Sequence, residues 1–167
     1  MPELNNQNFN HLKIHTQYSI CEGAIKIDNL KDFCKEKKIP CLGLSDTSNL
    51  CGALEFAENI SKVGTQPIIG TQIYFRFEDT TGLLPLIALN ENGYKRIIEL
   101  SSRSYLENDA ISDPHLDVKE LLIDTEGVSL LSGTIQGLFG KLFEKGRLDE
   151  ISKLYRSLSS KFNDNFS

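Results

Sequence analysis

The chain has 167 residues, of which 40% are hydrophobic and 25% charged, and its formal net charge is −5. This composition excludes collagen-like and intrinsically disordered proteins, and the length favours a single domain. No apolar run reaches the roughly 18 residues of a membrane span. The negative net charge argues against a chain that binds nucleic acid by itself. Residues 1–6 lack the basic and apolar regions of a signal peptide, so we expect a cytoplasmic protein.

The cysteines show neither a metal-binding nor a disulfide pattern. The four residues are Cys21, Cys34, Cys41 and Cys51. None of them belongs to a Cys-x-x-Cys pair, and no histidine lies at zinc-finger spacing from them. We therefore expect four reduced, mostly buried thiols, since a free cysteine packs as a small hydrophobic side chain.

Strand-like and helix-like segments alternate in the first half of the chain. Alternating polar and apolar residues predict a short strand over residues 10–15. Helices are expected over 28–37, with Asp28 as the N-cap, and over 50–63, with Leu54 facing inward. Short apolar runs predict further strands at residues 41–44, 67–70, 72–75 and 83–89, with a polar loop at 45–49 and a hairpin before residue 83.

The second half continues this alternation. A helix is expected over residues 94–106, a short helix capped by Asp117 follows, and residues 128–131 form a strand candidate. Two helices, over 135–144 and 149–162, are the last elements predicted. Strands that alternate with helices indicate an α/β fold with a largely parallel sheet or barrel.

In such folds chemistry gathers on the loops at the carboxyl ends of strands. This rule selects a first loop at residues 15–23, a second at 45–49 and the residues around Gln72. Three side chains of the two loops are good ligands for a divalent metal, namely His15, Glu22 and Asp46. A histidine and two carboxylates could hold such a metal and activate water. These residues are the candidate site of the chain.

The neighbouring positions do not complete a metal cluster. Sites with two or three metals need about six to nine protein ligands, mostly imidazole and carboxylate. Lys13 would repel a metal, and Thr47 and Gln72 are weak neutral ligands. A structural role stays open beside the metal site, in which His15 and Asp46 form hydrogen bonds that hold their loops in place.

Several motifs, in the same order along nearly the whole chain, resemble those of the polymerase and histidinol phosphatase (PHP) domain. They stand at residues 11–19, 22–24, 40–44, 45–50, 52–56, 66–70, 90–94 and 130–133. More narrowly, they resemble the PHP domain at the N-terminus of bacterial replicative DNA polymerase III alpha subunits, which are C-family polymerases. This resemblance implies an α/β fold of PHP type, an incomplete and distorted (β/α)7 barrel with mostly parallel strands.

The chain keeps only part of the metal site that active members of this family carry. His15, Glu22 and Asp46 match the family pattern. Where the family has two further histidines, a glutamate and commonly another histidine, the chain has Lys13, Thr47, Gln72 and Leu83. The resemblance therefore implies a degenerate site, with no catalytic residue, no cofactor in this segment and no residual zinc or manganese.

The resemblance also implies a function within a larger protein. Residues 1–167 would be the N-terminal part of a truncated PHP domain, a scaffold on which a proofreading exonuclease subunit docks. The parent polypeptide would carry out template-directed DNA synthesis as a nucleotidyltransferase. Its other domains would bind DNA and Mg²⁺, other replicative subunits would be partners, and no membrane would be involved. Two alternatives stay open, a stand-alone metal-dependent PHP phosphoesterase and a small regulatory protein derived from the same domain.

Overall fold

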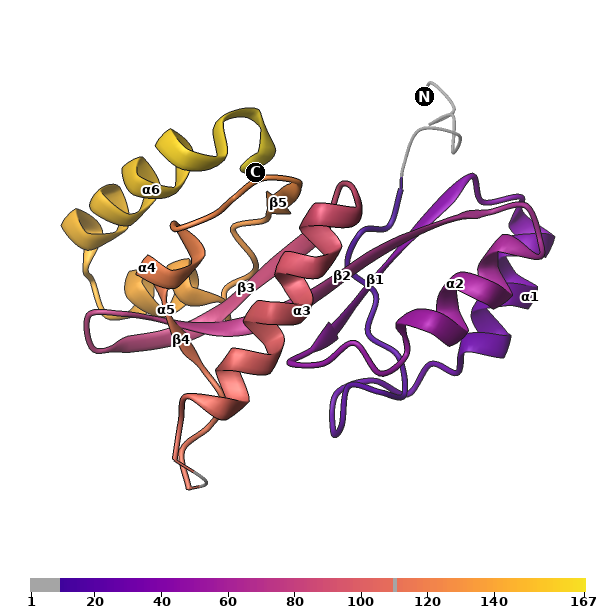
Figure 1. The fold of residues 1–167 in the computed structure, drawn as a ribbon, viewed down its shortest axis with the longest axis horizontal. Coiled ribbons are helices and arrows are strands. Elements are labelled where there is room, and N and C mark those ends of the chain that lie inside the picture. Colours follow the sequence, from indigo (N-terminus) through magenta and orange to yellow (C-terminus); the bar gives the residue numbers. More distant parts are fainter. Residues whose placement is uncertain (1–9, 110) are drawn as a thin grey trace.

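A computed structural model describes residues 10–109 and 111–167 of the chain. Its elements are α1 (Ile27–Lys37), β1 (Cys41–Thr47), α2 (Ala53–Ser61), β2 (Gln66–Phe77), β3 (Thr80–Ala88), α3 (Glu91–Leu106), β4 (Leu116–Asp117), α4 (Val118–Leu121), β5 (Val128–Leu130), α5 (Leu138–Glu144), α6 (Leu148–Phe162) and a 3-10 turn at Asn163–Asn165. The expected α/β class is confirmed. Figure 1 shows α1 and α2 together at one end of the sheet and α4, α5 and α6 at the other.

The sheet is mixed, with the strand order β1-β2-β3-β5 and with β4 also paired to β2. The β1–β2 and β2–β4 pairs are parallel, whereas the β2–β3 and β3–β5 pairs are antiparallel. Only Glu78 and Asp79 join β2 to β3, and a connection of two residues permits an antiparallel hairpin but no parallel crossover. The expectation of mostly parallel strands therefore holds for two of the pairs and not for the sheet.

The segment predicted as a strand over residues 10–15 is not a regular strand, but it lies along the outer edge of β1. The backbone N–H of Gly43 donates to the carbonyl oxygen of His11 over 2.7 Å, and that of Ser45 donates to Ile14 over 2.8 Å. One isolated parallel bridge joins Ile14 to β1. This contact fixes the position of the first candidate loop relative to the sheet.

Two of the predicted element boundaries differ from the structure, and one predicted helix cap is confirmed. Strand β1 extends to Thr47, because it pairs with β2 along its whole length, so the predicted polar loop begins too early. Asp28 lies inside the first turn of α1, whose N-cap is Lys26. Asp117 caps α4 as predicted, since its side chain accepts the N–H of Lys119 at 2.9 Å.

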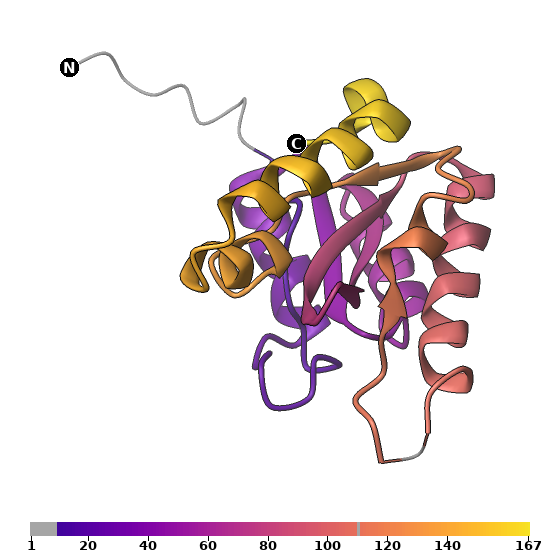
Figure 2. The same ribbon diagram turned by 90° about the vertical axis from the view of Figure 1, so that its left-hand side faces the viewer.

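Two hydrophobic cores hold these elements together. The smaller one lies between α1, α2 and β1 and consists of Ile27, Leu30, Cys34, Leu42, Leu44, Ala53, Phe56 and Ile60. The larger one packs β2, β3 and β5 against α3, α4, α5 and α6, and Figure 2 shows α3 and α6 on different sides of the central strands.

All four cysteines are free, as predicted, but Cys21 and Cys51 are exposed instead of packed. None of the helices in the described part of the chain combines the length and hydropathy that a membrane span requires.

Candidate functional site

Most of the predicted site residues line one cavity of about 330 Å³. Its walls are formed by Lys13, His15, Glu22, Gln72, Leu83, Pro85, Gly133, Thr134, Gln136 and Gly137. Two of the three candidate ligands, His15 and Glu22, are thus brought together with Lys13. The third, Asp46, is fully buried and does not line the cavity.

Strand geometry explains why Lys13 and His15 face the cavity. Ile14, between them, packs against the core formed by β1, α1 and α2. Successive side chains of an extended segment point to opposite sides. Lys13 and His15 therefore share the side opposite to Ile14, and both reach the cavity.

The register of neighbouring strands aligns residues beside and along this cavity. Thr47 of β1 pairs with Gln72 of β2, and Gln72 pairs in turn with Pro85 of β3. The segment 133–137, which precedes α5, contributes Gly133, Thr134, Gln136 and Gly137 to the wall of the cavity. The predicted start of α5 at residue 135 is wrong, because this segment is irregular and the helix begins at Leu138.

Asp46 fastens the first loop to the sheet. Its Oδ1 accepts the backbone N–H of Thr16 and the hydroxyl of Ser19, both at 2.6 Å. Its Oδ2 accepts the hydroxyl of Thr16 at 2.7 Å. A buried carboxylate without a cation needs such donors. Asp46 therefore makes hydrogen bonds that join this loop to β1.

A second chain of hydrogen bonds joins Glu22 to the sheet. The hydroxyl of Thr47 donates to the carboxylate of Glu22, and the side-chain amide of Gln72 donates to the same hydroxyl at 2.6 Å. Because the Thr47 hydroxyl donates its proton to Glu22, it can only accept from Gln72. The N–H₂ group of Gln72 must therefore face Thr47. Its own carbonyl oxygen, Oε1, is then left buried without a hydrogen-bond partner.

Burial and neighbouring charges perturb the two basic side chains of the cavity. Burial lowers the pKa of the Lys13 ammonium, and the negative charge of Glu22 opposes that shift. The pKa of His15 is also lowered, first by burial and then by the positive charge of Lys13, against the carboxylates of Glu22 and Asp46. Since the ordinary histidine pKa is about 6.5, a lowered value favours the neutral imidazole at pH 7.

The donor set of this cavity does not fit a resident divalent metal. Within residues 10–109 and 111–167, no group of three His, Cys, Asp or Glu side chains is arranged to hold a metal ion. Both carboxylate oxygens of Asp46 already accept hydrogen bonds from Thr16 and Ser19. Lys13 places a cation among the remaining candidates, which would repel a second one.

Two parts of the site escape prediction from the sequence. The hydroxyls of Thr16 and Ser19 bind Asp46 across about 30 residues of chain, and an isolated serine or threonine carries no periodicity or charge signal. The segment 133–137 lines the cavity although its glycines match no phosphate-binding motif. The glycine spacing was the one available sign that this segment is irregular.

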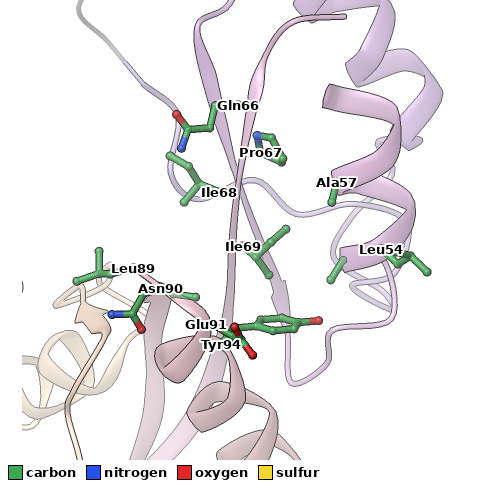
Figure 3. Close-up of a pocket in the computed structure, with 12 residues that line it drawn as sticks. Leu54, Ala57, Gln66, Pro67, Ile68, Ile69, Leu89, Asn90, Glu91 and Tyr94 are labelled. Carbon is green, nitrogen blue, oxygen red and sulfur yellow. The ribbon is translucent and has the colours of Figure 1, made fainter. Parts of the chain in front are cut away.

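A second hollow, an apolar groove of about 430 Å³, lies apart from the cavity. Figure 3 shows Leu54 and Ala57 of α2 on one side of β2 and the ring of Tyr94 from α3 across the lower end. Leu54 is 72% exposed, so the prediction that it faces inward is wrong. It lies at the rim of this groove because α2 buries a neighbouring stripe that contains Phe56 and Ile60.

Comparison with known proteins identifies the family. The PHP domain matches residues 11–167. The chain belongs to the PHP domain family. Among curated relatives of this PHP domain, the DNA polymerase III subunit alpha of Caulobacter vibrioides is 35% identical over 99% of the chain, and that of Rickettsia felis is 34% identical over 95%. The predicted resemblance is thereby confirmed.

The PHP chain is much shorter than these relatives. It spans 15% of the Caulobacter protein and 13% of the Rickettsia protein. A solved structure from Bifidobacterium adolescentis, described as a metal-dependent phosphoesterase, aligns with a TM-score of 0.44 at 16% identity, over 87% of this chain and 54% of that one.

Proposed function

We propose that this PHP domain is the N-terminal segment of a bacterial replicative DNA polymerase III alpha subunit and serves there as a structural scaffold. Its similarity to DNA polymerase III alpha subunits supports this role. Residues 1–167 are then part of a longer PHP domain whose complete form is a distorted (β/α)7 barrel. The parent polypeptide synthesises DNA on a template in the cytoplasm, and its other domains bind DNA and Mg²⁺.

The observation that carries this proposal is the state of the cavity. At the positions where active members of the family hold metal, the chain has a cation at Lys13 and a carboxylate, Asp46, whose oxygens are already occupied. His15, Glu22 and Asp46 are accordingly remnants that act in structure, and the segment has no catalytic residue and no cofactor. A stand-alone phosphoesterase would need the oxygens of Asp46 free for a metal.

The scaffold role includes docking of the proofreading exonuclease subunit, beside other replicative subunits. A polymerase segment without its own hydrolytic site leaves proofreading to a separate protein. The apolar groove between α2, β2 and the start of α3 is the surface we assign to this contact (Figure 3). Leu54 and Leu89 at this groove are 72% and 53% exposed, and exposed apolar side chains around a hollow are typical of protein interfaces.

A binding measurement with the purified exonuclease subunit of the same bacterium tests this role. We expect the 167-residue chain to bind it, and we expect Leu54→Glu to weaken the affinity at least tenfold, because a buried charge at an apolar contact costs more than about 1.4 kcal/mol. Ile123→Glu is the matched control, since Ile123 is 70% exposed and lies outside the groove. Absence of binding by the wild-type chain and by the full-length alpha subunit would contradict docking on this domain. Equal affinities of the two variants would contradict the assignment of the groove as the docking surface.

A further inference from the structure

Two residues that line the same cavity each carry a polar group without a partner. Gln72 is 3% exposed, and its Oε1 has no hydrogen-bond donor. The half-buried side chain of Lys13 lines this cavity too, and within the described residues its ammonium takes part in no hydrogen bond or ion pair. One group is an acceptor that lacks a donor, and the other is a cation with three donors.

The charges around the cavity favour a single cation. The carboxylate of Glu22 is in the wall, and that of Asp46 is close enough to act on His15. Among the lining residues of the described chain, Lys13 is the one lysine or arginine. A lysine ammonium is a compact charge on a flexible stem of four carbons, so it can adjust to an acceptor within the cavity.

We propose that Lys13 is the built-in cation of this cavity, which supplies the positive charge that a divalent metal supplies in a metal-binding PHP site. In this proposal the flexible stem turns so that the ammonium donates to Oε1 of Gln72 and balances the carboxylate of Glu22. The side chains of Glu22, Thr47 and Gln72 then form one network with Lys13, and every member of it has a partner. This inference rests on the metal-free scaffold proposed above and adds the group that replaces the metal.

The network has a structural consequence. Glu22 belongs to the first loop, Thr47 to β1 and Gln72 to β2, and Lys13 lies on the segment that runs along the outer edge of β1. The cation therefore ties together three parts of the chain that are separate in sequence. Lys13 is a positioning residue of this network.

Chemical rescue of a cavity variant tests this proposal. Lys13→Ala in the 167-residue chain removes the ammonium and leaves space for a small cation. We expect its Tm to fall by about 2–4 °C. Methylammonium should restore more of that loss than tetramethylammonium at the same concentration, because tetramethylammonium has no N–H to donate. The wild-type chain, Lys13→Arg and the exposed control Lys62→Ala should show no such selective response.

The outcomes separate the two proposals. If Lys13→Ala has the Tm of the wild-type chain, or if both cations affect it equally, the built-in cation is refuted while docking of the exonuclease stays intact. If the wild-type chain takes up one equivalent of Zn²⁺ or Mn²⁺ at this cavity, both the cation and the metal-free scaffold are refuted. If Lys13→Ala fails to fold, Lys13→Met takes its place in this test. Methionine keeps the apolar stem and fills the space, so this variant should lose stability and should not be stabilised by methylammonium.

Discussion

Replacement of Asp46 by alanine is expected to lower the free energy of unfolding by about 3 kcal/mol or more. The change leaves the N–H and hydroxyl of Thr16 and the hydroxyl of Ser19 without their acceptor. Each buried polar group that loses its partner costs about 1–3 kcal/mol. Urea denaturation of the variant and the wild-type chain measures the difference.

Asp46→Asn is the matched control for this experiment. Asparagine has the same shape and keeps one oxygen acceptor, so it can retain part of the bonding to Thr16 and Ser19. We expect its stability to lie between those of the wild-type chain and Asp46→Ala. A loss below about 1 kcal/mol for Asp46→Ala would show that this carboxylate does not hold the first loop.

The second large effect is expected for Gly23→Ala, next to Glu22. A Cβ at this position would overlap the backbone carbonyl oxygen of Thr16. Backbone cannot move aside as the end of a flexible side chain can, so the loop must shift. We expect a loss of about 3 kcal/mol, at the upper end of the usual cost of overpacking, together with weakened hydrogen bonding of Glu22 to Thr47.

Gly64→Ala separates crowding from backbone strain. Gly64 has a φ of +79°, and a Cβ added there would meet nothing within 4 Å. Its substitution should therefore cost only the penalty for a left-handed residue, about 1 kcal/mol. If thermal or urea unfolding shows equal losses for Gly23→Ala and Gly64→Ala, the close approach of the loop to Thr16 is not important for stability.

The sequence allowed most of the elements to be predicted, because helices and buried strands leave periodic patterns. The direction of strand pairing was less accessible. The hairpin expected before residue 83 is confirmed, because β2 and β3 are antiparallel and only Glu78 and Asp79 join them, but no local pattern marks the antiparallel pairing of β3 with β5. The orientation of Leu54 failed for a related reason, since several apolar stripes of α2 could have faced the core and tertiary packing selected one of them.

The residues of the candidate site could be predicted from the sequence, but their hydrogen bonds could not. His15 and Glu22, near the two ends of the first loop, line the cavity together with Lys13. Asp46 was a candidate ligand by residue type, yet the donors that occupy its oxygens come from a loop that is remote in sequence. Which of two roles a carboxylate takes is decided by such long-range contacts, and residue type does not reveal them.

Metal content together with hydrolysis tests the central claim most directly. The 167-residue chain would be loaded with Zn²⁺ or Mn²⁺, dialysed, and assayed for bound metal and for hydrolysis of a phosphomonoester. The metal-free scaffold predicts no stoichiometric metal and no hydrolysis above the rate without protein. One or more equivalents of bound metal, with hydrolysis that is lost in His15→Ala, would contradict it.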